Sequence, residues 1–261
     1  MRPVHHFLLS RLPMQIAFAP TWIYLEESPL AASPQDFFTY GKLRFNRQVS
    51  LKVNPYCLGA RYFTTSGFWE PDITQSLLSR SHSGLLIDIG ANYGYFSVLW
   101  LQQKDNRVIA VEPVSEYVNL LQENLATYKE RSKIVSACIG DGDKRVYLDT
   151  MGDPQMLSKV IDVPSSDSRE VPMLSLESLL AKYNEHHIDV LKIDAEGYDI
   201  KILESCKSLF SARRVTTVYW ETASSPEEDI VIQNLEKNGY VRILSGDMTG
   251  YELDHKREFT D

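Results

Sequence analysis

From residue 84 onward, apolar residues occur either in short continuous runs or at the spacing of one helix face. The continuous runs predict strands buried on both faces, at 84–89, 107–112, 133–139, 188–194 and 215–221. The helically spaced segments predict helices at 93–103, 115–128, 176–184, 197–210 and 226–238. Two more strands, near 240–244 and 250–257, predict an antiparallel edge hairpin. The alternation predicts an α/β fold with a doubly wound, mostly parallel, seven-stranded sheet.

The first 66 residues follow a different pattern. Residues 40–53 alternate between apolar and polar side chains around Asn46, which predicts a β-hairpin. The aromatic stretch 56–69 predicts either core packing, which is the commoner fate of an aromatic side chain, or a lid over a substrate. Residues 1–19 partly imitate a signal peptide, but the uncharged run 12–25 contains two prolines and is too short to cross a bilayer. We expect a docked N-terminal segment and no membrane span.

Local turn and cap signals complete the pattern. Glu70-Pro71-Asp72 predicts the start of a helix that runs to Leu78, because proline and acidic residues suit the first turn. Asp141-Gly142-Asp143 predicts a turn into a short strand at 144–149. Residues 151–170 are polar and contain Pro and Ser, which predicts a flexible loop.

Composition narrows the classes of function. The formal net charge of −8 argues against a non-specific nucleic-acid binder, which would need a basic face. The three cysteines, Cys57, Cys138 and Cys206, are scattered and form no C-x-x-C motif, so neither a disulfide framework nor a structural zinc site is expected. A reducing compartment such as the cytoplasm is the corresponding prediction.

Residues 85–94, LLIDIGANYG, predict a strand, a glycine turn and the start of a helix. Glycine lets a ligand approach the backbone, and free N–H groups at a helix start favour a nucleotide-like ligand. The spacing is Asp-x-Gly-x-x-x-Gly and not the G-x-G-x-x-G of dinucleotide folds. Asp88 would repel a pyrophosphate and attract an ammonium group, so S-adenosylmethionine fits better than NAD. The alternative is a strand–turn–helix without a ligand.

Polar residues also end the next two predicted strands. Glu112-Pro113 follows the second strand, about 20 residues beyond the glycine turn, where an acid suits the ribose hydroxyls of a nucleoside. Cys138-Ile139-Gly140-Asp141 ends the third strand, at the edge expected to face an adenine. Asp141 would accept a hydrogen bond from the adenine amine, or serve only as a turn residue.

The fourth predicted strand ends in a cluster of charges. Lys192, Asp194 and Glu196 lie at the end of a buried strand and the first turn of a helix. Burying such groups costs several kcal/mol unless they pair or act on a ligand. The cluster therefore predicts either a structural ion pair of Lys192 with one of the acids, or an active site. Glu221 ends the fifth strand and either joins this cluster or is a structural acid.

Together these motifs resemble the FkbM-type class I S-adenosylmethionine-dependent methyltransferases. The match extends over residues 67–245 and rests on Glu70-Pro71, Asp88 to Tyr95, Glu112-Pro113, Lys192 to Gly197, Glu221 and Asn238 to Tyr240. The resemblance implies a Rossmann-like S-adenosylmethionine-binding domain at 67–261. It leaves residues 1–66 as an N-terminal extension that we expect to act as a lid or substrate region.

The resemblance also implies roles for single residues. S-adenosylmethionine would donate a methyl group to oxygen on a natural product, a glycan or a modified peptide. Its methionine part would be held by Asp88, Gly90, Ala91, Asn92, Tyr93 and Gly94. Glu112 and Pro113 would contact the ribose, and the adenine would lie against Cys138, Ile139 and Asp141. Glu70 is counted with these cofactor-binding residues.

Methyl transfer requires an aligned acceptor and the exclusion of water. A hydroxyl acceptor needs a base, for which Asp194 and Glu196 are the candidates. A carboxylate acceptor is already ionised and needs only positioning by Lys192 or Arg61. We expect O-methylation by Asp194, Glu196 and Lys192, no metal, and an acceptor site that includes Arg61, Tyr62 and Glu221. The alternatives are a non-catalytic methyltransferase-like binding module and, less favoured, an NAD-dependent oxidoreductase.

Overall fold

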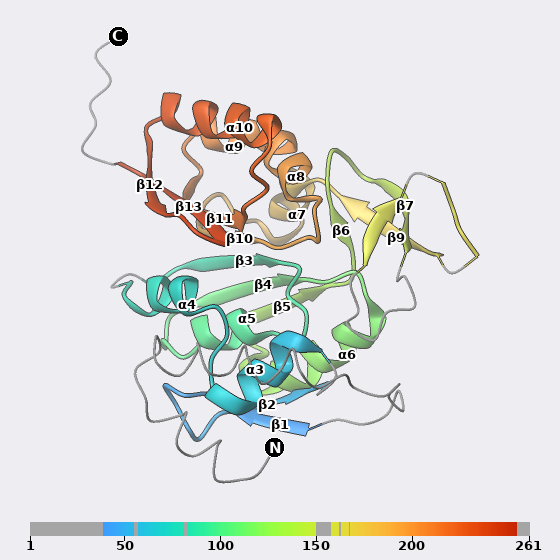
Figure 1. Cartoon of the computed structure of the whole chain (residues 1–261), viewed down its shortest axis with the longest axis vertical. Helices are drawn as coiled ribbons and strands as arrows, with labels where there is room; N and C mark the ends of the chain where they lie inside the picture. Colours follow the sequence, from blue (N-terminus) through green and yellow to red (C-terminus); the bar gives the residue numbers. More distant parts are fainter. Residues whose placement is uncertain are drawn as a thin grey trace.

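The computed structural model describes residues 39–54, 57–80, 83–149, 158–161, 163–166 and 168–254. Its centre is a seven-stranded sheet with the strand order β12-β13-β11-β10-β3-β4-β5 (Figure 1). The strands are β3 (Leu85–Ile89), β4 (Arg107–Val111), β5 (Ser132–Val135), β10 (Ile188–Ile193), β11 (Val215–Glu221), β12 (Tyr240–Leu244) and β13 (Met248–Leu253). β13 runs antiparallel to both of its neighbours, and the other pairs are parallel. The predicted mostly parallel seven-stranded sheet is confirmed.

Helices pack on both faces of this sheet (Figure 1). One face carries α3 (Leu58–Ser66), α4 (Pro71–Leu78), α5 (Tyr95–Trp100) and α6 (Ser115–Asn124), which a short 3₁₀ turn (Ala126–Tyr128) follows. The other face carries α7 (Leu176–Tyr183), α8 (Asp199–Ser205), α9 (Lys207–Ser211) and α10 (Pro226–Lys237). Successive side chains of a strand point to opposite faces, so β3 sends Leu86 into one apolar cluster and Ile87 into the other. This explains why the strands are continuous apolar runs.

The third predicted strand, 133–139, is wrong as a single element. Only Ser132–Val135 pairs in the main sheet, and the chain bends at Ala137. Cys138–Ile139 forms β6, which pairs with β9 (Ser168–Leu174) in a second sheet of order β6-β9-β7-β8. An apolar run does not reveal which strand it will pair with, and here two sheets share one run.

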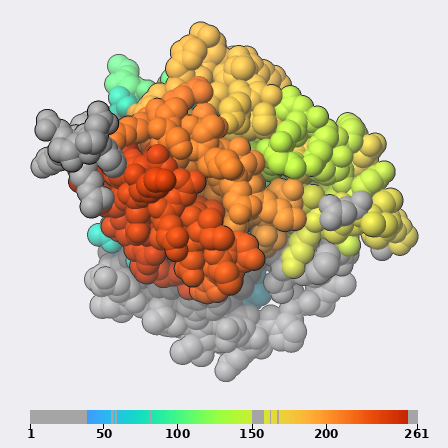
Figure 2. All heavy atoms as spheres, turned by 90° about the horizontal axis from the view of Figure 1, so that it is seen from above, coloured from blue at the N-terminus to red at the C-terminus, as the bar shows by residue number. Residues whose placement is uncertain are grey.

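The second sheet also corrects the predicted loop at 151–170. β7 (Lys144–Asp149) is the predicted short strand, but β8 (Lys159–Ile161) and the start of β9 lie where a loop was expected. Residues 151–157 lie outside the described part of the chain. Cross-strand pairing, and not the polar composition of the segment, decides its structure. Figure 2 shows the atoms of this sheet, in yellow and green, beside the orange atoms of the α8–α9 segment.

The predicted N-terminal hairpin is confirmed by the antiparallel pair β1 (Thr39–Lys42) and β2 (Ser50–Val53). Asn124 of α6 accepts a hydrogen bond from the Lys52 N–H at 2.7 Å and donates to the Lys52 carbonyl at 2.9 Å, so the hairpin is tied to the main fold. The aromatic stretch packs into the core, where Phe63 and Phe68 are fully buried. The predicted docked segment 1–35 lies outside the described residues, none of which forms a helix long and apolar enough to cross a membrane.

Candidate active site

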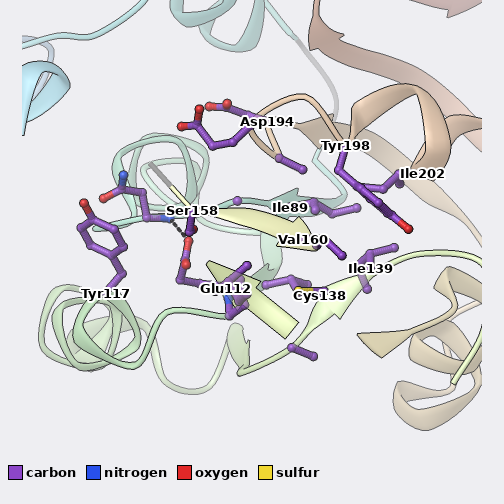
Figure 3. Close-up of a pocket in the computed structure, with 18 residues that line it drawn as sticks. Ile89, Glu112, Tyr117, Cys138, Ile139, Ser158, Val160, Asp194, Tyr198 and Ile202 are labelled. Carbon is purple, nitrogen blue, oxygen red and sulfur yellow. Dashed lines mark hydrogen bonds between the residues drawn. The ribbon is translucent and has the colours of Figure 1, made fainter. Parts of the chain in front are cut away.

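A pocket lies at the carboxyl ends of the parallel strands (Figure 3). Along the chain, the strands run outward from β3 to β5 and then return to β10 on the other side of β3. Ligands of open α/β sheets bind at such a reversal of strand order. The pocket wall includes Ile89 at the end of β3, Glu112 after β4 and Asp194 after β10.

The glycine turn brings these strand ends together. The N–H groups of Gly90 and Ala91 both donate to the Val111 carbonyl, at 3.0 and 3.1 Å, and the Asp194 N–H donates to the Ile89 carbonyl at 3.1 Å. Gly90 has a φ of 72°, and a Cβ atom there would overlap the carbonyl oxygen of Asp194. Only glycine fits both the left-handed backbone and this close approach, which explains its place in the motif.

Glu112 forms the middle of the pocket wall. Its carboxylate accepts hydrogen bonds from the N–H groups of Asn92 and Val114, both at 2.9 Å, and the residue is 5% exposed. Burial raises the pKa of Glu112 to about 7, although these two N–H groups and Lys192 oppose the shift. The structure therefore places Glu112, Pro113 and Asn92, which the sequence assigned to the cofactor, in the wall of the pocket.

One end of the pocket is apolar. Cys138 and Ile139 of β6 lie there with Leu148 of β7 and Val160 of β8, which are cross-strand partners. Tyr198 and Ile202 of the α8 region cover the same end (Figure 3). The sequence reasoning missed Val160 because it expected a loop at 151–170, and it gave the predicted strand 144–149, which carries Leu148, no partner strand. The apolar residues Val146 and Leu148 were the available signal.

Asp141 does not lie at the pocket. Its side chain is 65% exposed and forms an ion pair with Lys144, with Oδ1 and Nζ 2.6 Å apart. This placement agrees with the second interpretation of the sequence, a turn residue.

The opposite end of the pocket is acidic, with Asp194 and Glu196 in its wall. Lys192 stands behind them, 1% exposed, with Nζ 3.0 Å from Asp194 Oδ2 and 3.7 Å from Asp88 Oδ1. Burial lowers the pKa of Lys192, but Asp194, Asp88 and Glu70 outweigh it and hold the pKa above its ordinary value. Lys192 is thus a buried cation in an ion pair with Asp194, and it does not line the pocket.

Asp88 is fully buried and points away from the pocket wall. Its Oδ2 accepts a hydrogen bond from Ser97 Oγ of α5 at 2.7 Å, and its Oδ1 faces Lys192. Burial raises the pKa of Asp88 above its ordinary value. The expectation that Asp88 attracts a ligand ammonium group directly does not match this arrangement.

Asp199, which the sequence reasoning missed, supports the segments beside the acidic end of the pocket. It is 2% exposed and accepts hydrogen bonds from the N–H of Ala195 at 3.1 Å and the N–H of Glu221 at 3.3 Å. These bonds join the loop after β10 to the end of β11. Glu196 of that loop adopts a left-handed φ of 51°. Burial, Asp194 and Glu221 raise the pKa of Glu196 to about 7. An acidic residue at the start of a helix was the signal in the sequence.

The remaining predicted residues divide between core and surface. Tyr62 is fully buried beside Trp69, and Arg61 is half-buried on α3. Glu221 is exposed at the end of β11; the pairing of Lys192 with Tyr219 places it beside Asp194. Three predicted cofactor residues, Ala91, Tyr93 and Gly94, shape the turn without lining the pocket. Among the described residues, no group of three or more His, Cys, Asp or Glu side chains is arranged to hold a metal ion.

Several solved methyltransferase structures share a distant likeness with this chain. An S-adenosylmethionine-dependent O-methyltransferase from Thermotoga maritima is 14% identical, with a TM-score of 0.43 over 74% of this chain and 68% of that one. Trm5b from Pyrococcus abyssi is 10% identical, with a TM-score of 0.44 over 84% and 56%. A precorrin-6y C5,15-methyltransferase from Geobacter metallireducens is 13% identical, with a TM-score of 0.40 over 69% and 83%.

Sequence comparison gives the family. No curated protein matches the chain. The model of the methyltransferase FkbM domain matches residues 88–242, which is more than half of the 261 residues and includes the glycine turn, Glu112 and the Lys192–Gly197 segment. The chain therefore belongs to the FkbM methyltransferase family, with S-adenosylmethionine as its methyl donor.

Proposed function

We propose that this protein is an O-methyltransferase that acts on a hydroxyl group of a natural product, a glycan or a modified peptide. The observation that carries the proposal is the order of chemistry along the pocket. The pocket runs from an apolar end at Ile139 and Val160, past the buried carboxyl of Glu112, to the acids Asp194 and Glu196. This order matches the adenine, the ribose and the charged end of S-adenosylmethionine.

The pocket residues fit the donor in three places. Ile139, Leu148 and Val160 offer apolar surface to a flat ring. Glu112 offers carboxylate oxygens to ribose hydroxyls, with its position set by the N–H groups of Asn92 and Val114. When bound, the donor supplies a methyl group on a positively charged sulfur, and Asp194 is the acid suited to lie near that charge.

Asp194 and Glu196 are the groups that we assign to the acceptor. Both lie in the pocket wall, and the ion pair with Lys192 fixes the Asp194 carboxylate. A carboxylate that holds a hydroxyl by its proton both orients the oxygen and accepts the proton. An acceptor carboxylate would face Asp194, Glu196 and Glu221 with like charge, so the arrangement favours a hydroxyl.

Three further parts of the proposal rest on the sequence. Residues 1–66 are assigned to acceptor recognition, and residues 67–261 to a doubly wound catalytic domain. The net charge of −8 supports a small-molecule, glycan or peptide acceptor over a nucleic acid. The three cysteines are scattered along the sequence, and all of them are free and buried. Free cysteines support action in the cytoplasm.

Ligand-induced stabilisation tests the donor site. S-adenosylhomocysteine should raise the melting temperature of the full chain, since a ligand that binds only the folded state stabilises it by mass action. NAD and NADP should leave it unchanged. Glu112→Gln should reduce the shift, and Glu204→Gln, on the exposed side of α8, should not. Stabilisation by NAD in place of S-adenosylhomocysteine would refute the proposed function.

A further inference from the structure

Tyr117 of α6 has a buried hydroxyl in the wall of the pocket. The residue is 3% exposed and lines the pocket, and Figure 3 shows it on the opposite side of Glu112 from Cys138 and Ile139. Its hydroxyl oxygen has no hydrogen-bond partner in the described part of the chain. Leaving a buried polar atom without a partner is unfavourable, so an unpaired hydroxyl in a pocket wall points to a ligand that completes it.

The packing of α6 holds the ring of Tyr117 in this position. Asn124 lies two helical turns beyond Tyr117 on the same face of α6, and its amide donates a hydrogen bond to the Tyr93 carbonyl at 2.7 Å. The same amide bonds to the backbone of Lys52 in β2. This face of α6 is therefore anchored to both the glycine turn and the hairpin, with Tyr117 enclosed between them and the pocket.

Asn92 of the glycine turn supplies a second hydrogen-bond donor. Its Oδ1 accepts the N–H of Tyr93 at 2.7 Å, and its own N–H donates to Glu112 at 2.9 Å. The oxygen of the amide is thereby occupied, which leaves the Nδ2 group as the donor end of a side chain that lines the pocket. The Asn92 side chain lies beside the Tyr117 hydroxyl, so two donors of different elements meet in one part of the wall.

The amino end of α3 lies on the same side of the pocket. Cys57, the residue before α3, also lies beside the Tyr117 hydroxyl, and its side chain makes no capping hydrogen bond. The first N–H groups of a helix have no partners within the helix and carry a partial positive charge. The start of α3 therefore adds to the preference of Tyr117 and Asn92 for a negatively charged group.

The rest of the lining indicates which ligand group needs such a place. Among the described residues, no lysine, arginine or histidine lines the pocket, whereas three acids do: Glu112, Asp194 and Glu196. A ligand carboxylate would be repelled by these acids and has only neutral donors to bind. S-adenosylmethionine carries a carboxylate at its amino-acid end, and its sulfonium and ammonium groups suit the acids.

We propose that Tyr117 and Asn92 form a carboxylate subsite, which binds the α-carboxylate of S-adenosylmethionine. This inference rests on the proposed function and adds Tyr117 to the residues that select the methyl donor. The Tyr117 O–H and the Asn92 Nδ2 group both donate to the carboxylate oxygens. A nucleoside that offers the same adenine and ribose but no carboxylate leaves the Tyr117 hydroxyl unpaired, so the pocket discriminates against it.

Calorimetry with two ligands tests the subsite. S-adenosylhomocysteine and its decarboxylated analogue, S-adenosyl-3-thiopropylamine, differ only in the carboxylate. The full-length wild-type protein should bind S-adenosylhomocysteine at least tenfold more tightly. Tyr117→Phe should weaken S-adenosylhomocysteine binding about tenfold, as expected for a lost hydrogen bond to a charged group, and change binding of the analogue less than twofold. Tyr183→Phe, at the end of α7 and outside the lining, should change neither.

Asn92→Asp tests the second donor with an opposite sign for the two ligands. Aspartate keeps an acceptor for the Tyr93 N–H and tolerates the left-handed φ of 52°, but it replaces the Nδ2 donor with a negative oxygen. S-adenosylhomocysteine should bind more than tenfold more weakly, whereas the analogue, a cation, should bind as well as before or better. Ser158→Ala tests the hydroxyl at the β8 side of the pocket and should leave the ratio of the two affinities unchanged.

The free protein gives an independent measurement. Tyr117→Phe removes a buried polar atom that has no partner, so the melting temperature without ligand should not fall. A fall would show that the hydroxyl is bonded within the protein and would overturn the inference. Equal weakening of both ligands in Tyr117→Phe or Asn92→Asp, or a selective loss of S-adenosylhomocysteine in Ser158→Ala, would also overturn it. Equal binding of the two ligands to the wild type refutes the subsite alone, whereas binding of neither refutes the proposed function as well.

Discussion

Asp88 and Asp194 show how differently two acids at neighbouring strand ends are used. Both contact Lys192, at 3.7 and 3.0 Å, but Asp88 is fully buried against α5, whereas Asp194 is half-buried and lines the pocket. An acid enclosed with a lysine and a serine hydroxyl is a structural group. An acid that forms an ion pair with a buried lysine and also faces a pocket is placed to act on a ligand.

Substitution of the pocket acids separates chemistry from donor binding. Asp194→Asn and Glu196→Gln should each lower turnover by about 10²-fold, the typical contribution of a general base. Affinity for S-adenosylhomocysteine should change little. Turnover is measured as S-adenosylhomocysteine formed with an acceptor found by screening hydroxyl-bearing natural products, sugars and peptides, and affinity by calorimetry. Wild-type turnover in both variants would show that these acids have no part in the reaction.

At the scale of elements, the second sheet supplies the wall that closes the pocket beside the strand ends of the main sheet. β6 leaves the line of β5, pairs with β9, and brings β7 and β8 over the apolar end of the pocket. Leu148 and Val160 face the pocket because they are register partners on these two strands. Two antiparallel strands that turn one face toward a ligand supply apolar contacts without a specific sequence motif.

A matched pair of valines tests this wall. Val160→Ala should weaken S-adenosylhomocysteine binding by roughly 1 kcal/mol, or about fivefold, because two methyl groups no longer contact the ligand. Val163→Ala is the control, since Val163 follows the same strand but is 76% exposed and lies outside the pocket lining. Equal affinities for the two variants, measured by calorimetry, would remove β8 from the donor site.

At the scale of the whole molecule, the buried acids at and near the site lower the free energy of unfolding as the pH rises. Glu112, Asp88 and Glu70 are acids whose pKa is raised mainly by burial, so the folded chain binds their protons more tightly than the unfolded chain does. Their contribution to stability is complete below the unfolded pKa and is lost as the pH rises through the folded pKa. Of these acids, Glu112 lines the pocket, whereas Asp88 and Glu70 do not.

The pH dependence of unfolding tests this relation at Glu112. Between about pH 4.5 and 7, the free energy of unfolding of the wild-type protein should fall relative to that of Glu112→Gln by on the order of 3 kcal/mol. Glutamine removes the titration and keeps the size of the side chain. Denaturant unfolding at a series of pH values measures the difference, and parallel curves for the two proteins would contradict it.

The sequence by itself determined the sheet, the glycine turn and the position of acids at the strand ends. These follow from local signals: apolar runs, glycines where φ is positive, and the convergence of parallel strand ends at one edge. The turn at Gly90 and the place of Glu112 at the pocket were predictable for that reason.

Only the tertiary structure decided which way each acid points and which strands close the pocket. Asp88 faces Ser97 and Lys192, Asp141 faces solvent, and Asp199 joins the loop after β10 to the end of β11, because contacts between elements set these directions. The split of 133–139 between two sheets has the same cause. Periodicity reports burial along one element, whereas packing between elements determines what each polar group meets.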